Sequence, residues 1–215
     1  MRRGFKAQAE RAAAAARRAI GVSPHAPLDP WAYAAHLKVK IFEFAALGLA
    51  AQAVRQLTVT DEESWSAMTL QVNGAFAIVL NPAHAITRQR GDLMHELSHI
   101  ELRHAPIRVE VSDSGLLLLS DFSDEQEQEA DWHGAALLLP RDGIIRMRSA
   151  RKSTAEIAAY YGVSEALCEW RLRMTGVDVQ LRRAYTGAAF SALSWCRIPD
   201  HPRSSSSACS SSERA

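Results

Sequence analysis

The chain has 215 residues, of which 47% are hydrophobic and 23% are charged. This composition is typical of a soluble globular protein and excludes a wholly disordered or fibrous chain. The 25 basic and 24 acidic residues give a net charge of only +1, so no overall charge is present that would bind a polyanion.

The three cysteines, Cys168, Cys196 and Cys209, are widely spaced and form no C-x-x-C pair. They predict neither a disulfide framework nor a cysteine-based zinc site, and they favour a reducing compartment. No stretch reaches 18 uninterrupted apolar residues, and the first 20 residues lack the apolar segment of a signal peptide. We therefore expect a cytoplasmic protein.

The first half of the chain predicts two helices, a strand and a hairpin. In chain order these are a helix over 5–20, a helix from 30 to about 37, a strand over 39–44, and paired strands over 65–72 and 75–80. Asp29 is expected to cap the second helix, with Pro30 at its first position. Asn73-Gly74 is a dipeptide typical of a hairpin turn. The secondary structure of residues 45–60 is ambiguous from the sequence pattern.

The second half predicts mainly helices. In chain order these elements are a helix over 86–103, strands over 107–111 and 116–119, and helices over 123–139, 144–150, 153–161 and 164–175. Ser123 and Gln126 have the spacing of a capping box. Residues 199–215 include seven serines between 204 and 212, so we expect this tail to be disordered.

The sequence His95-Glu96-Leu97-Ser98-His99 lies within the helix predicted over 86–103. Side chains four residues apart on a helix project from one face, so both imidazoles can bind the same zinc ion. Glu96 can accept a proton from a water molecule that attacks a carbonyl group. The pattern H-E-x-x-H on a helix is therefore typical of a metallopeptidase.

A catalytic zinc needs a third protein ligand. Leu102 and Ala105 stand where a metzincin would have Gly and His, and His104 is expected at the surface or behind the ligands. A carboxylate on the next helix is the alternative. Glu127 can bind the metal while Asp131, four residues later, hydrogen-bonds a ligand histidine.

Two other interpretations of this acidic helix remain open. Glu129 lies on a different helix face, and the fold could turn that face toward the metal instead. Alternatively, Glu125, Glu127 and Glu129 are solvated acidic residues that stabilise the start of the helix through its dipole.

Several segments together resemble the ImmA/IrrE family of metallo-endopeptidases, which are bacterial and phage-associated zinc peptidases. The similarity covers about residues 4–175 and departs from the family at His133, where Phe is usual, and at Gly134, where Ala is usual. We expect His133 to be a core histidine. The segments that carry the resemblance are Gly4-Phe5-Lys6 with Ala9-Glu10, Pro27–Pro30, Met94–His99, Glu127–Pro140, and Val163-Ser164 with Ala166 and Arg171-Leu172.

The resemblance implies a regulatory zinc endopeptidase that cleaves a helix-turn-helix repressor or antitoxin. It also implies that Glu127 joins His95 and His99 as the third ligand of one Zn²⁺ per chain, with Glu96 as the catalytic residue. The same ligand set can hold Mn²⁺. The expected fold class is α+β and zincin-like: a small, mainly antiparallel sheet packs on the metal-binding helix, and a helical subdomain follows.

The expected domains are a metallopeptidase domain over 1–147, a helix-turn-helix-like subdomain over 148–185, and a serine-rich tail over 186–215. Residues 141–152 carry five basic groups and one acidic group, a charge that favours binding to the phosphate groups of DNA. The acidic residues of the helix pair, Glu156, Glu165 and Glu169, instead favour a cap on the peptidase or a grip on the substrate.

Two other functions fit the same sequence. One is a regulator that binds a repressor or DNA without cleaving it, and the other is the toxin component of a toxin–antitoxin pair. If the chain does cleave, a substrate segment is expected to add as a strand at a sheet edge near the hairpin over 65–80.

Overall fold

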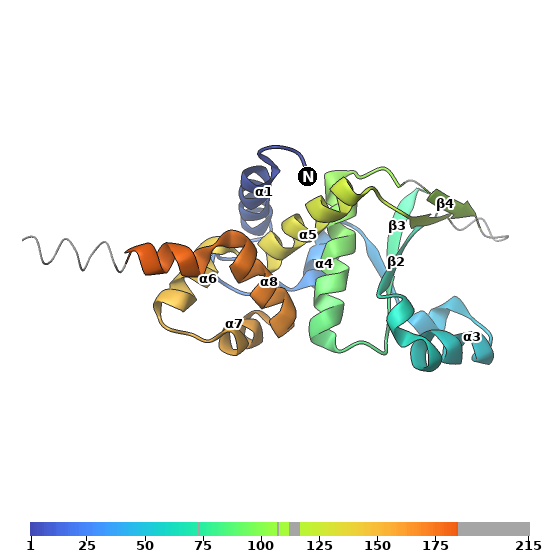
Figure 1. Cartoon of the computed structure of the whole chain (residues 1–215). Coiled ribbons are helices and arrows are strands. Elements are labelled where there is room, and N and C mark those ends of the chain that lie inside the picture. The colour runs from blue at the N-terminus through green and yellow to red at the C-terminus, as the bar shows by residue number, and fades with distance from the viewer. Residues whose placement is uncertain (73, 107, 112–116, 185–215) are drawn as a thin grey trace, which may run out of the picture. The chain divides into compact units, whose positions relative to one another are not determined.

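The computed structural model describes residues 1–72, 74–106, 108–111 and 117–184 of the chain (Figure 1). The predicted tail over 186–215 lies outside these residues. The elements in chain order are α1 (Phe5–Ala19), α2 (Pro30–His36), β1 (Lys40–Phe42), the short helical turns η1 (Phe44–Leu47), α3 (Ala51–Arg55), η2 (Gln56–Thr60) and η3 (Glu62–Ser64), then β2 (Ala67–Val72), β3 (Ala75–Leu80), α4 (Ile86–Leu102), β4 (Arg108–Val111), β5 (Leu117–Ser120), α5 (Asp124–Leu138), α6 (Arg141–Ser149), α7 (Thr154–Tyr161) and α8 (Glu165–Thr175).

The five strands form one sheet in the order β1-β3-β2-β5-β4. β2 and β3 form the predicted hairpin, in which Val72 pairs with Ala75 and Gly74 adopts a φ of +79°. β2 also pairs antiparallel with β5, and β5 with β4, whereas β1 pairs parallel with β3. The predicted α+β class with a small, mainly antiparallel sheet is therefore confirmed.

The two faces of the sheet are covered differently. On one face, Leu70, Ala77 and Val79 pack with Phe44 and Trp65, so the segment that was ambiguous in sequence covers this side with short helical turns. Because side chains alternate along a strand, Thr69 and Ile78 point to the opposite face, where both are buried and α4 packs. α4 thus lies between the sheet and α5 (Figure 1).

α4 and α5 pack closely because α5 has a glycine at the contact. A Cβ at Gly134 would lie 3.2 Å from the carbonyl oxygen of Met94, which is tight for any larger residue. The adjacent His133 is fully buried, and its Nε2 lies 2.9 Å from Oε2 of Glu101 on α4. Tyr33 donates a hydrogen bond to the same oxygen over 2.7 Å. Both departures from the family pattern therefore lie at the α4–α5 interface.

Two buried arginines tie the outer helices to α5. Arg17 on α1 donates a hydrogen bond to the carbonyl oxygen of Leu137 over 2.5 Å. Arg171 on α8 donates to the carbonyl oxygen of Leu139 over 3.1 Å and forms an ion pair of 2.7 Å with Glu10 on α1. A buried charge is tolerated when it is hydrogen-bonded, as both guanidinium groups are, and Arg171 has a carboxylate partner as well.

Contacts divide the chain into a compact unit over Met1–Asp178 and a second unit over Val179–Ala215, of which residues 179–184 are described and helical. The start of the predicted helical subdomain, up to Asp178, therefore belongs to the same compact unit as α4 and α5. The boundary predicted at residue 147 stays a prediction. Within the described residues, each helix is too short or too polar to cross a membrane.

The contact between α6 and α7 gives a first test of this compact unit. A Cβ at Gly143 would overlap the hydroxyl of the buried Tyr161, which donates a hydrogen bond to the carbonyl oxygen of His25. We expect Gly143→Ala to lower the free energy of unfolding by about 1–3 kcal/mol, measured by urea denaturation. Adding Tyr161→Phe removes the overlapping oxygen and should restore part of the loss.

Gly91→Ala is the matched control, because its Cβ would meet Leu167 Cδ2 at 3.5 Å, an ordinary contact. Its effect should be neutral, or stabilising by up to about 1 kcal/mol through helix propensity. Equal losses at Gly91 and Gly143, or no rescue by Tyr161→Phe, would show that α6 and α7 do not pack as described.

Candidate metal centre

The candidate ligands come from two helices whose local sequences fix their positions. His95 and His99 are one turn apart on α4, as the predicted helix requires. α5 begins after a capping box in which Ser123 Oγ accepts from the Gln126 amide and Gln126 Oε1 accepts from the Ser123 amide. This start places Glu127 in the first turn of α5, facing α4.

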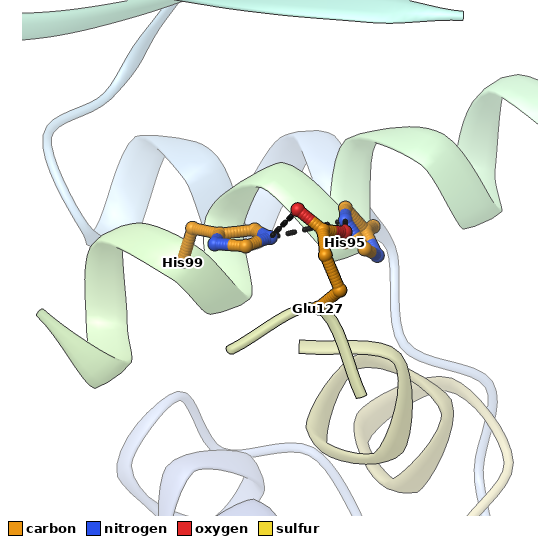
Figure 2. A group of neighbouring side chains, drawn as sticks. All are labelled: His95, His99 and Glu127. Carbon is orange, nitrogen blue, oxygen red and sulfur yellow. Dashed lines mark hydrogen bonds and ion pairs between the residues drawn. The ribbon is translucent and has the colours of Figure 1, made fainter. Parts of the chain in front are cut away.

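The three side chains point toward one another from α4 and α5 (Figure 2). The Nε2 atoms of His95 and His99 lie 3.0 Å apart, and Glu127 carboxylate oxygens lie 3.1 Å from His95 Nε2 and 3.7 Å from His99 Nε2. Ligands at about 2.0–2.1 Å from a tetrahedral metal ion lie about 3.3 Å from one another. The donor atoms therefore already have nearly the spacing that such an ion requires.

A carboxylate orients the first histidine. Asp131 Oδ1 lies 3.0 Å from His95 Nδ1, which leaves Nε2 directed at the donor group. A hydrogen bond from the far ring nitrogen to a carboxylate fixes the orientation of a metal-binding histidine. Asp131 lies one turn after Glu127 on α5, so one helix face supplies both the candidate ligand and this orienting group.

Glu96 lies beside the donor group. Its Oε2 accepts a hydrogen bond from the hydroxyl of Thr69 on β2. Burial raises the pKa of Glu96, although the charge of His95 and the Thr69 hydrogen bond oppose this effect. A carboxylate held in this way is a stronger base than one in water, which suits it to accept a proton.

His104 was expected either at the surface or behind the ligands, and the structure does not place it at the surface. Its side chain is only 5% exposed, and its Nδ1 lies 3.1 Å from Nδ1 of His99. Phe122 stacks on the His99 ring with the ring centroids 3.8 Å apart. His104 therefore lies behind a candidate ligand, outside the donor group.

Glu129, the competing candidate for the third ligand, also lies outside the donor group. Its buried carboxylate accepts hydrogen bonds of 2.8 Å from both Nε and Nη2 of Arg2. Its other close partner is His104, whose Nε2 lies 3.5 Å away. The structure thus brings Glu127, and not Glu129, to His95 and His99.

Titration behaviour follows from the crowding of these groups. Burial lowers the pKa of His95, but hydrogen bonds to Asp131 and Glu127 outweigh this effect and raise it to about 10. Burial and the nearby charge of His95 lower the pKa of His99 to about 3. The hydrogen bond from His95 lowers the pKa of Glu127. Without metal, a proton on His95 therefore provides the positive charge in the donor group.

A family model described as Peptidase_M78, IrrE N-terminal-like domain, matches residues 54–173, which is more than half of the chain. The chain belongs to the IrrE N-terminal-like peptidase family. The match confirms the resemblance drawn from the sequence. No curated protein and no solved structure matches the chain.

Membership of the IrrE N-terminal-like family makes this chain a metallopeptidase-type protein, with a metal ion as its expected cofactor. The matched residues include all of α4 and α5, and so the complete donor group of His95, His99 and Glu127 together with Glu96. The family match and the geometry therefore point to the same place in the fold.

Sequence reasoning missed three residues around this centre: Thr69, Phe122 and Arg2. Thr69 contacts Glu96 from a strand 27 residues earlier, and Arg2 reaches Glu129 across 127 residues. Phe122 precedes the cap of α5, and no local pattern singles it out. Each contact depends on tertiary packing, so no spacing rule in the sequence signals it.

The proton on His95 predicts how metal affinity depends on pH. Metal binding needs a neutral imidazole, so each ion bound below a pKa of about 10 must displace about one proton. The apparent Zn²⁺ affinity should therefore rise about tenfold per pH unit between about pH 6 and about pH 8. Calorimetry in buffers of different ionisation enthalpy measures the released proton directly.

Asp131→Asn provides the internal check on this prediction. It removes the negative charge that holds the proton on His95, so the number of protons released at about pH 8 should fall. A wild-type affinity independent of pH over this range would show that His95 is not protonated in the metal-free protein.

Proposed function

We propose that this chain is a zinc-dependent endopeptidase with a regulatory role, whose substrate is a helix-turn-helix repressor or antitoxin protein. The observation that carries the chemistry is the convergence of His95, His99 and Glu127 with Glu96 beside them. The substrate class rests on the resemblance to the ImmA/IrrE family. Zinc is the proposed metal because two imidazoles and one carboxylate are a donor set typical of catalytic zinc.

When bound, zinc supplies Lewis acidity: it lowers the pKa of a water molecule and polarises a carbonyl oxygen. His95, His99 and Glu127 would hold it. Glu96 accepts the proton of the attacking water and returns it to the leaving amine. Thr69 fixes one oxygen of Glu96 by a hydrogen bond, which leaves the other oxygen for the proton.

A cavity of about 390 Å³ opens beside His95 and Glu96. Its other walls come from α5, the start of β2 and the start of α8, and small or apolar residues such as Gly134, Ala135 and Leu167 contribute to them. Such a cavity can receive a substrate side chain next to the scissile bond.

The start of β2 supplies a place for the substrate backbone. The Asn81 amide donates a hydrogen bond to the carbonyl oxygen of Ser66. In an antiparallel pair of strands, every second residue bonds to the partner strand, so the backbone N–H and C=O groups of the next residue, Ala67, point away from β3. β5 pairs with β2 only over Thr69–Gln71, and within the described strands none pairs with Ala67 on that side. Ala67 also lines the cavity, so an extended substrate can pair there.

This position makes the expectation of a substrate strand at a sheet edge near the hairpin more specific. β3 is paired by β1 over Ala77–Val79, and β2 is paired by β5 over Thr69–Gln71. Among the parts of the hairpin outside these pairings, the start of β2 is the one that lines the cavity beside the candidate metal centre.

The surroundings of α8 favour a role in the substrate cleft over DNA binding. Its first turn contributes Leu167 to the cavity wall, and its Cys168, Arg171 and Leu172 are buried. Its exposed side carries Glu165 and Glu169, which would repel phosphate groups. We therefore propose that this helix pair contacts the protein substrate.

The Thr69 hydrogen bond predicts a shift in the pH profile of hydrolysis. Thr69→Val removes a donor that stabilises the ionised form of Glu96, so the pKa of Glu96 should rise further. Because the base must be ionised, the acid limb of kcat/KM should move to higher pH. Thr69→Ser keeps the hydroxyl and is the control, and an unchanged acid limb in Thr69→Val would contradict this role.

The proposed activity itself is tested by comparing new protein N-termini in host cells that express the wild type or Glu96→Gln. We expect a short set of termini that depends on Glu96, with a cut in a helix-turn-helix repressor or antitoxin among them. Metal content is measured on both purified proteins, because Glu96→Gln should retain one metal ion per chain. Identical sets of termini from metal-loaded proteins would contradict the proposal.

A further inference from the structure

We propose that Arg2, Glu129 and His104 form a chain of contacts that positions His99 and thereby sets the affinity of the metal centre. The inference rests on the proposed metal site and adds positioning residues that lie outside the donor group. It links the segment before α1 to a candidate ligand on α4.

The first contact joins His99 to His104. His99 directs Nε2 at His95 and Glu127, while its Nδ1 lies 3.1 Å from His104 Nδ1. A histidine that binds metal through Nε2 carries its hydrogen on Nδ1, so His99 Nδ1–H would donate to His104 Nδ1. His104 then carries its own hydrogen on Nε2.

The second contact joins His104 to Glu129. His104 Nε2 lies 3.5 Å from Glu129 Oε2, and both side chains are almost fully buried, at 5% and 3% exposed. The carboxylate therefore favours the form of His104 that leaves Nδ1 free to accept from His99. His95 contacts its carboxylate, Asp131, directly, whereas His99 reaches a carboxylate through a second imidazole.

The third contact neutralises the buried carboxylate. Arg2 donates from Nε and Nη2 to the two oxygens of Glu129 over 2.8 Å each, and its backbone amide donates to Oε1 over 3.3 Å. A buried carboxylate needs such a partner, and paired donation from Arg fixes its orientation. Arg2 is itself 61% exposed, so this link can be changed without opening the core.

The chain backbone also holds His104 in place. Arg103 adopts a left-handed φ of 56°, and the His104 amide donates to the carbonyl oxygen of His99 over 3.0 Å. This turn ends α4 and folds His104 back over His99. Phe122 packs on the face of the His99 ring, and His104 contacts the edge of the ring at Nδ1, so the ring is restrained from two sides.

The test is the affinity for Zn²⁺, measured by competition with a chromophoric chelator on the full chain. Loss of a residue behind a ligand typically weakens metal binding about 10–100-fold, and we expect this for His104→Phe. Arg2→Ala should weaken binding by about tenfold, since it removes the partner of Glu129 and not the imidazole. His104→Gln can still accept from His99 and should recover part of the affinity.

Arg3→Ala is the matched control, because Arg3 is an exposed arginine next to Arg2. The absorption of bound Co²⁺ gives a second readout: His104→Phe should change it, and Arg3→Ala should not. Thermal unfolding of each metal-free variant identifies any that fail to fold, and Arg2→Ala and His104→Gln disturb the core least.

Wild-type affinity and an unchanged Co²⁺ spectrum in both His104→Phe and Arg2→Ala would overturn the inference. In that case the proposed metal centre still stands if Glu127→Ala loses the metal. Equal metal binding by the wild type and Glu127→Ala would overturn the metal centre itself, and with it this inference.

Discussion

The close packing of α4 on α5 is the constraint on which the metal centre depends. His95 and His99 lie on one of these helices and Glu127 on the other, so the distance between the helices sets the size of the donor group. Gly134 permits this distance, because a Cβ there would press on the backbone at Met94. The sheet holds α4 from its other side, where Thr69 reaches Glu96. The candidate metal ligands and Glu96 are thus positioned by these two interfaces of α4.

Each candidate histidine ligand is oriented from behind by a different part of the chain. Asp131 orients His95 from within α5, whereas His99 depends on His104 and, through Glu129, on Arg2. The cavity proposed to receive the substrate is lined by α4 and α5, the start of β2 and the start of α8. The candidate ligand His95 and the orienting Asp131 also line this cavity, whereas His104, Glu129 and Arg2 lie outside its lining.

Local sequence signals predicted most of the elements and the centre of the site. Three of these signals depend only on neighbours within a few residues, so the sequence alone predicts them. They are the capping box at Ser123, the hairpin at Asn73-Gly74 and the spacing of His95 and His99. The choice between Glu127 and Glu129 could not be settled, because both lie on the same short acidic turn and only the packing of α5 decides which one faces α4. The positions of Thr69 and Arg2 depend on contacts across 27 and 127 residues.

If His95, His99 and Glu127 together hold one metal ion, anomalous diffraction at the zinc edge from crystals prepared with Zn²⁺ will locate it. We expect one peak per chain, at about 2.0–2.2 Å from Nε2 of both histidines and from a carboxylate oxygen of Glu127. A peak bound by Glu129 in place of Glu127, or one located away from α4, would contradict it.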